Sequence, residues 1–165
     1  MMIRQLHEQD AKNYRNLRLE ALRVSPEAFG STLEEEKDFP VEKYITRIQI
    51  KDSYTYGVFE QHELIGIITL VKEKLMKLSH RANIVAMYVC PEKRDLGIGR
   101  DLVNAAIHKA RELEGIEQIH LTVVTSNQPA RNLYLRLGFE VVGTEKQALK
   151  LDDTYYDEDL MVLYL

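Results

Sequence analysis

Residues 94–102 (Arg-Asp-Leu-Gly-Ile-Gly-Arg-Asp-Leu) constrain the fold more than any other segment, because they join the end of a strand to the start of a helix. Residues 83–89 have the apolar, β-branched and aromatic side chains typical of a strand, which Pro91 ends by removing a backbone donor. Apolar side chains then recur at helical spacing up to Gly115, which is suited to follow a helix: Leu102, Val103, Ala106, Ile107, Ala110 and Leu113. The sequence therefore predicts a strand, a glycine-containing loop and a helix in direct succession.

This loop has the properties of an anion-binding site. Gly97 and Gly99 allow the backbone to turn with its N–H groups pointing inward, while Arg94 and Arg100 add positive charge beside a helix N-terminus, which itself favours anions. A dinucleotide fingerprint would need glycine in place of Leu102, and a P-loop would need Lys-Ser or Lys-Thr after its last glycine. By itself, such a pattern is more often a tight structural loop. If the loop is an anion-binding site, a phosphate or pyrophosphate is expected to bind to Arg94, Asp95, Leu96, Gly97, Ile98, Gly99 and Arg100.

A second segment, residues 127–139, changes this interpretation. Asn127 is suited to cap a helix, Pro129 is tolerated in a first turn, and Gly138 suits the left-handed residue after a helix. Together the two segments resemble the GCN5-related N-acetyltransferase (GNAT) family. Its coenzyme loop, Arg/Gln-x-x-Gly-x-Gly/Ala, is matched by Arg94, Gly97 and Gly99. Its later pattern, Asn-x-x-Ala-x-x-Leu-Tyr-x-x-x-Gly-Phe, is matched by Asn127, Ala130, Leu133, Tyr134, Gly138 and Phe139.

The resemblance extends over nearly the whole chain and implies an N-acetyltransferase. Such an enzyme transfers the acetyl group of acetyl-coenzyme A directly to a primary amine. The acceptor is then a small molecule, polyamine-like or another cationic amine, or a protein. The other hypothesis is a module that binds or senses acyl-coenzyme A without turnover. The resemblance also implies that the fourth and fifth strands splay apart beside the coenzyme. Coenzyme contacts are then expected from the loop and from Met87, Tyr88, Val89, Asn127, Ala130 and Tyr134.

On the strand at 83–89, Met87 and Val89 are expected to offer backbone groups to the coenzyme, with Tyr88 and Cys90 on the opposite face. Tyr134 is similar to the family's general acid, and a phenol with a pKa of about 10 can protonate a thiolate whose conjugate acid has a pKa near 8.5. The alternative is that Tyr134 is a buried aromatic in one apolar helix stripe.

The group that accepts the amine's proton is not assigned by the sequence. Glu34 and Glu35, with Glu36, lie in a segment (27–39) predicted to be irregular and similar to the family's acceptor-side loop, so Glu34 and Glu35 are candidates for substrate binding. A second acidic group contains Asp152, Asp153, Asp157, Glu158 and Asp159. For any single residue of these two groups, a solvated charge run is the more common explanation. No metal site is predicted. Cys90 is not expected to act as a covalent nucleophile, because the sequence assigns no base to activate its thiol.

Composition sets wider limits. A chain of 165 residues fits a single domain, here an N-acetyltransferase domain over residues 1–165. A net charge of −4 argues against nucleic-acid binding. The longest apolar stretch, residues 64–71, is too short for a bilayer, and no signal peptide is visible. With Cys90 the only cysteine, no internal disulfide is possible. A cytoplasmic enzyme with no membrane association is therefore expected.

The predicted element order is β-α-α-β-β-β-α-β-α-β-β. It indicates an α+β fold, with helices packed on a mixed, largely antiparallel sheet, as the family resemblance also implies. Residues 54–60 and 64–71 are predicted to form one hairpin, and residues 139–150 and 155–164 another. The apolar run 160–165 suggests a homodimer through the last strand, although a strand in the interior of the sheet explains it equally well.

Overall fold

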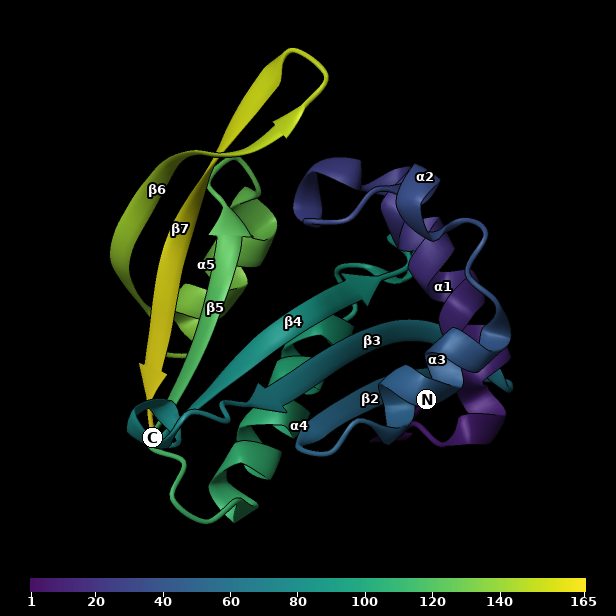
Figure 1. Ribbon diagram of the computed structural model, residues 1–165, viewed down its shortest axis with the longest axis horizontal. Helices are drawn as coiled ribbons and strands as arrows, with labels where there is room; N and C mark the ends of the chain where they lie inside the picture. The colour runs from purple at the N-terminus through teal and green to yellow at the C-terminus, as the bar shows by residue number, and fades with distance from the viewer.

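The computed structural model describes residues 1–165, and a seven-stranded mixed sheet forms its centre (Figure 1). The spatial order of the strands is β1-β2-β3-β4-β5-β7-β6, and every neighbouring pair is antiparallel except β4 and β5. This confirms the predicted α+β class and the largely antiparallel sheet. The strands are β1 (Met2–Gln5), β2 (Ser53–Glu60), β3 (Glu63–Lys72), β4 (Arg81–Val89), β5 (Gln118–Val124), β6 (Glu140–Leu151) and β7 (Thr154–Tyr164).

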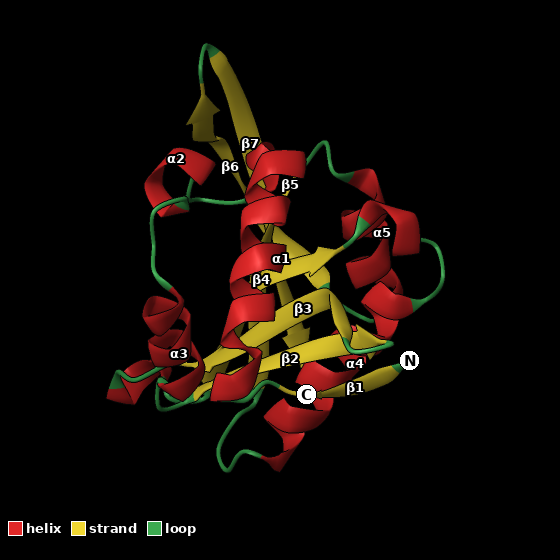
Figure 2. Ribbon diagram, turned by 90° about the vertical axis from the view of Figure 1, so that its right-hand side faces the viewer, coloured by secondary structure: helices red, strands yellow, loops and turns green.

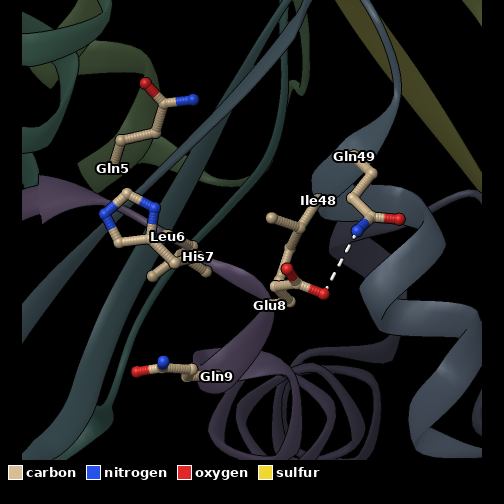
Figure 3. A pocket seen from close by; sticks show the side chains of 7 residues that line it. All are labelled: Gln5, Leu6, His7, Glu8, Gln9, Ile48 and Gln49. Carbon is tan, nitrogen blue, oxygen red and sulfur yellow. Dashed lines mark hydrogen bonds between the residues drawn. The ribbon is translucent and has the colours of Figure 1, made fainter.

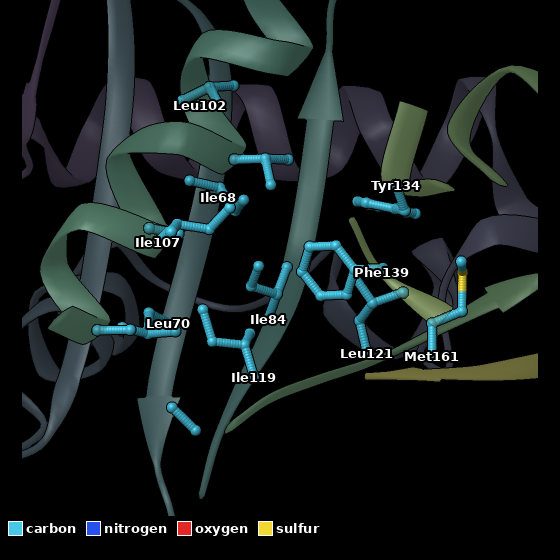
Figure 4. Close-up of a cluster of buried hydrophobic side chains, with 14 of the residues drawn as sticks. Ile68, Leu70, Ile84, Leu102, Ile107, Ile119, Leu121, Tyr134, Phe139 and Met161 are labelled. Atoms are coloured by element: carbon cyan, nitrogen blue, oxygen red, sulfur yellow. The ribbon is translucent and has the colours of Figure 1, made fainter. Parts of the chain in front are cut away.

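Helices cover both faces of the sheet, so the central strand β3 is buried almost throughout and reads as a continuous apolar run. Figure 2 shows α1 (Ala11–Val24) and α3 (Val41–Gln49) in front of the sheet, with α4 (Ile98–Glu112) behind it. The side chains of α4 and α5 (Gln128–Arg136) share one core with β2–β5 and β7 (Figure 4). A smaller second core joins α1 and α3 to the opposite face of the sheet.

β4 and β5 separate soon after they begin. They pair only between residues 81–83 and residues 118–120, and beyond this point the two strands diverge (Figure 1). β4 also carries a bulge, because Ile68 of β3 lies opposite both Ala86 and Met87, and Ala86 has a φ of 54°. The splay is the feature that the family resemblance implies. The bulge was not predicted from the sequence.

The C-terminal hairpin forms as predicted, but its order in space accounts for the apolar run at the end of the chain. β7 lies between β5 and β6, so residues 160–164 are in an interior strand, and Met161 and Val162 are buried. This placement explains the run without a partner chain. β6 forms the edge of the sheet instead.

The segment 27–39 is not irregular, contrary to the sequence prediction. It contains a short helix, α2 (Leu33–Glu36), that begins at Thr32 with a capping box: the Thr32 hydroxyl accepts from the Glu35 N–H, and the Glu35 carboxylate accepts from the Thr32 N–H. The sequence prediction missed this helix, because Glu34, Glu35 and Glu36 were considered for their charge and not as part of a capping box. None of the helices of the protein combines the length and the apolar character needed to cross a bilayer.

Candidate active site

The loop before α4 presents a row of backbone donors with no acceptor in the chain. The first hydrogen bond of the helix runs from the Asp101 N–H to the Gly97 carbonyl (3.1 Å), and the N–H groups of residues 95–100 donate to no protein atom. Asp95 and Gly97 both have positive φ, at 62° and 81°, which turns these donors to one side. Successive N–H groups at a helix start bind phosphate oxygens, so the residues fit the pyrophosphate of acetyl-coenzyme A.

Gly99 allows the start of α4 to approach its neighbours closely. A Cβ atom at this position would lie 3.2 Å from the Leu133 side chain on α5 and 3.2 Å from the Met87 side chain on β4. The loop therefore lies where β4, α4 and α5 meet, at the splayed end of the sheet. A residue larger than glycine would press on the Leu133 and Met87 side chains, which would have to shift to make room.

The two arginines of the loop point in different directions. The Arg94 Nε–H donates to the Val89 carbonyl oxygen (3.0 Å), and its guanidinium lies 5.6 Å from the centre of the Tyr88 ring. The Arg100 guanidinium lies beside Gly97 and also contacts Asp101 (3.0 Å). Arg100 is thus positioned next to the free N–H groups, whereas Arg94 stabilises the end of β4.

The outer edge of β4 faces the space left by β5. The Cys90 N–H donates to the Ile65 carbonyl (3.0 Å), so the backbone groups of Cys90 point toward β3 and those of Val89 point away from it. The Val89 carbonyl is the group that Arg94 contacts. Met87 lies in the bulge, and the Tyr88 side chain is on the opposite face, buried against α1. The coenzyme contacts of Met87, Tyr88 and Val89 stay predictions.

Tyr134 reaches from α5 to β4. Its ring is buried beside Phe139 (Figure 4) and packs edge-on against it, with 5.7 Å between ring centres. Its hydroxyl donates to the Met87 sulfur (3.2 Å). Burial raises the pKa of Tyr134, so the phenol keeps its proton. The start of α5 is fixed by Asn127, whose side chain accepts from the Ala130 N–H (3.4 Å). Tyr134 is therefore a core aromatic whose hydroxyl donates a hydrogen bond to a residue of β4.

The acidic residues that the sequence singled out have different surroundings. Glu34 is exposed and contacts Lys37 (2.7 Å). The Glu35 carboxylate accepts from the Thr32 N–H, so the interactions of both glutamates are local to α2. Asp157 accepts from Lys146 (3.1 Å). Asp159 is buried and accepts from Arg131 (2.7 Å) and from Thr144 (2.7 Å).

Glu158 is different, because it has no cationic partner. It lies directly opposite Glu145 in the β6–β7 ladder, so the two carboxylates share one face of the hairpin. Asp159 points to α5, and Glu158 therefore points to the other face, on which α1 and α2 lie. Burial and the charge of Glu145 raise the pKa of Glu158. A bound cation would relieve this repulsion.

Glu36 was grouped with its neighbours from the sequence, yet it is almost fully buried. It accepts hydrogen bonds from Arg18 (3.0 Å), Tyr44 (3.1 Å) and Arg47 (3.1 Å), which come from α1 and α3. Burial opposes its charge, but the hydrogen bonds from Arg18 and Arg47 outweigh burial and lower the pKa of Glu36 to about 2. The position of Tyr44 and Arg47, three residues apart on one helix, is the only hint of this network in the sequence.

Two further residues on the α1 face were not recognised as a pair from the sequence. The Tyr88 hydroxyl donates to the Glu20 carboxylate (3.0 Å), which joins β4 to α1.

Burial and the nearby Glu20 charge raise the pKa of Cys90 to about 12, so this thiol is not a nucleophile near neutral pH. A separate hollow lies between β1 and α3 (Figure 3). Its lining includes none of the residues described above.

The chain is similar to known proteins over nearly its whole length. The family model of the acetyltransferase (GNAT) domain matches residues 3–160. The chain belongs to the GNAT family. It is 30% identical over 120 residues to an N-alpha-acetyltransferase from Sulfurisphaera tokodaii, covering 59% of this chain and 72% of that protein. It is 27% identical over 97 residues to the L-amino acid N-acetyltransferase AaaT from Escherichia coli, covering 58% of each.

Solved structures agree with this fold. The chain superposes on YncA from Salmonella typhimurium, solved with acetyl-CoA, with a TM-score of 0.86 and 20% identity over 100% of this chain and 94% of the other. A spermidine N-acetyltransferase chimera from Vibrio cholerae and hSSAT gives a TM-score of 0.80 with 22% identity, over 99% and 94% of the two chains. The protein is an acetyl-CoA-dependent N-acetyltransferase, and the hypothesis of a module without turnover is set aside.

Proposed function

We propose that the acceptor of this N-acetyltransferase is a small cationic amine that carries a second positive charge. The observation that supports this most directly is the Glu145–Glu158 pair, two facing carboxylates without a cationic partner on the face where α1 and α2 lie. A single ammonium or guanidinium group bound there would be attracted by both carboxylates and would reduce their mutual repulsion. Protein N-termini are a second candidate, because the relative from Sulfurisphaera tokodaii is an N-alpha-acetyltransferase.

The residues of this chain have separable tasks in the proposed reaction. The free N–H groups of residues 95–100 and Arg100 hold the pyrophosphate. The edge of β4 at Met87 and Val89 orients the pantetheine arm. Acetyl-CoA, when bound, supplies the activated acetyl group. Tyr134 gives its proton to the sulfur as the thiol leaves.

A panel of amines tests the acceptor. We expect thiol release to be fastest with diamines and polyamines, and slower with neutral monoamines and with peptides that have a free N-terminus. Glu158→Gln and Glu145→Gln should each raise the KM for a diamine about tenfold, which corresponds to about 1.4 kcal/mol, and leave the KM for acetyl-CoA unchanged.

Asp153→Asn, in the exposed turn of the same hairpin, is the matched control. Equal KM values for diamines in all three variants would remove Glu145 and Glu158 from the acceptor site. A peptide N-terminus used faster than any diamine would favour the second candidate.

A further inference from the structure

We propose that Glu20 is the carboxylate that takes the proton from the acceptor amine, with the Tyr88 hydroxyl holding it in place. The inference rests on the proposed acetyl transfer to an amine, and it names a group for which the sequence gave no assignment. Glu20 lies near the C-terminal end of α1, and Tyr88 lies between Met87 and Val89 on β4. Their hydrogen bond of 3.0 Å joins residues 68 positions apart in the chain.

The placement of Glu20 follows from the two faces of β4. On the face shared with α4 and α5, Met87 accepts from the Tyr134 hydroxyl. On the other face, Tyr88 packs in the core formed with α1 and donates to Glu20. The proton donor and the proposed proton acceptor therefore flank the same stretch of β4 from opposite sides. Acyl transfer moves two protons, since one must leave the nitrogen and another must reach the sulfur, and this placement offers a separate group for each.

The surroundings of Glu20 suit a carboxylate that receives a cation. The Phe29 ring lies 6.5 Å from the Tyr88 ring, and Arg18, which is 4.9 Å from Phe29, is already bound to Glu36. Arg94 is committed to the Val89 carbonyl. Glu20 itself forms no salt bridge, and its side chain is only half-buried. An ammonium group that reaches Glu20 therefore meets a carboxylate that has no salt-bridge partner.

The proton balance is simple. The ammonium form of the acceptor first loses a proton to solvent. Its nitrogen then bonds to the acetyl carbon while the carbon–sulfur bond breaks, and the nitrogen becomes far more acidic as this bond forms. Glu20 takes the nitrogen's proton and Tyr134 supplies the proton that the sulfur needs. Glu20 afterwards loses its proton to solvent and Tyr134 regains one, so a single proton is released per acetyl group transferred.

Four variants test this role: Glu20→Gln, Glu20→Ala, Glu20→Asp and Tyr88→Phe. We expect Glu20→Gln and Glu20→Ala to lower kcat by about 10²–10⁴-fold, while the Kd for acetyl-CoA measured by calorimetry stays within about twofold. The dependence of kcat/KM on pH should differ between the wild type and Glu20→Gln, because the variant has no carboxylate to accept the proton. Added formate should restore turnover to Glu20→Ala, because it can occupy the space of the lost carboxylate, and Glu20→Asp should retain part of the activity.

Tyr88→Phe separates positioning from proton transfer, because it should lower kcat only modestly and keep the pH profile. Glu42→Gln, an exposed carboxylate on α3, is the matched control and should behave as the wild type. If Glu20 only anchors Tyr88, then Glu20→Ala and Tyr88→Phe will lose similar thermal stability, formate will not restore turnover, and the pH profile will not change. That result would overturn the proposal.

The two proposals fail in different ways. If Glu145 and Glu158 variants bind diamines normally while Glu20 variants lose turnover with every amine, the proposed acceptor is wrong and the role of Glu20 stands. If Glu20→Gln acetylates all amines at the wild-type rate, the role of Glu20 is wrong whatever the acceptor is.

Discussion

Tyr134 combines two properties that are often treated as alternatives. Its ring fills the core beside Phe139, and its hydroxyl reaches Met87 at the edge of the splay. Burial raises the pKa of this phenol, which keeps the proton in place across the neutral and mildly alkaline range. Burial of the ring is therefore compatible with the proposed role of the hydroxyl as a general acid.

Tyr134→Phe removes this hydroxyl and retains the ring. We predict that kcat falls by about 10²–10⁴-fold, that the Kd for acetyl-CoA changes little, and that the free energy of unfolding drops by about 1 kcal/mol. Steady-state kinetics at saturating substrates and urea unfolding measure the three quantities. Tyr56→Phe, at a half-buried tyrosine of β2, is the control. Normal turnover in Tyr134→Phe would make Tyr134 a packing residue only.

At Gly99, the absence of a Cβ atom allows the start of α4 to approach its neighbours. We predict that Gly99→Val raises the Kd for acetyl-CoA at least tenfold, because its side chain would press on Leu133 and Met87 and displace the row of N–H groups. Isothermal titration with acetyl-CoA measures the change. Gly30→Ala, where an added Cβ meets no atom within 4 Å, should bind normally. Equal affinities in the two variants would contradict the role of the loop.

At the scale of elements, the short helix α2 depends on α1 and α3. Four residues alone are too few for a stable helix in water. Glu36 compensates by accepting from Arg18 on α1 and from Arg47 on α3, so three elements share one buried carboxylate. Arg18 also lies over Phe29 and thereby fixes the segment between α1 and α2 against β4.

This network predicts a specific loss of stability in acid. The pKa of Glu36 is about 2 in the folded protein and 4.5 in the reference state, so its contribution is complete above pH 4.5 and is lost as the pH falls toward 2. The difference corresponds to about 3 kcal/mol. Glu36→Gln should be less stable at pH 7, since it leaves two arginines unpaired. Its free energy of unfolding should also fall less steeply than that of the wild type between pH 4.5 and pH 2.

Urea unfolding at several pH values measures both effects. Identical slopes for the wild type and Glu36→Gln would mean that Glu36 does not hold its charge through these arginines. Because Asp10 and Asp159 also have lowered pKa values, the comparison between the two proteins is the informative quantity, and the acid sensitivity of the wild type alone is not.

At the scale of the whole molecule, the splay of β4 and β5 joins distant parts of the chain. The loop before α4, the edge of β4 and the second half of α5 meet at this point, although they are far apart in sequence. Acetyl-CoA bound there would contact all three at once. Ligand binding to the folded state alone should therefore stabilise the protein as a unit.

We predict that acetyl-CoA at 100 times its Kd adds about 2.7 kcal/mol to the free energy of unfolding. For a chain of this length, thermal unfolding should then shift upward by several degrees, about 5–10 °C. Differential scanning fluorimetry with acetyl-CoA, and with free acetate as the control, measures the shift. Gly99→Val at the same coenzyme concentration should lose most of it. An equal shift in this variant would place coenzyme binding elsewhere.

The sequence by itself determined the class of the fold and the family, because both depend on local signals. Helix caps, glycines at positive φ and apolar periodicity act over a few residues, so Gly97, Asn127 and Gly138 are recognisable without a structure. The hairpins, the helix after Pro40 and the two motifs were predicted for the same reason. The functions of the individual site residues stay predictions that the variants above test.

Only the tertiary structure decided which charges and hydroxyls meet. The three consecutive glutamates look alike in sequence, but burial against Arg18 and Arg47 distinguishes Glu36. The Glu20–Tyr88 pair depends on the packing of α1 on β4, and the interior place of β7 depends on the order of strands in the sheet. A residue's chemical role depends on its neighbours in space, and these are set by contacts between residues far apart in the chain, which no local pattern encodes.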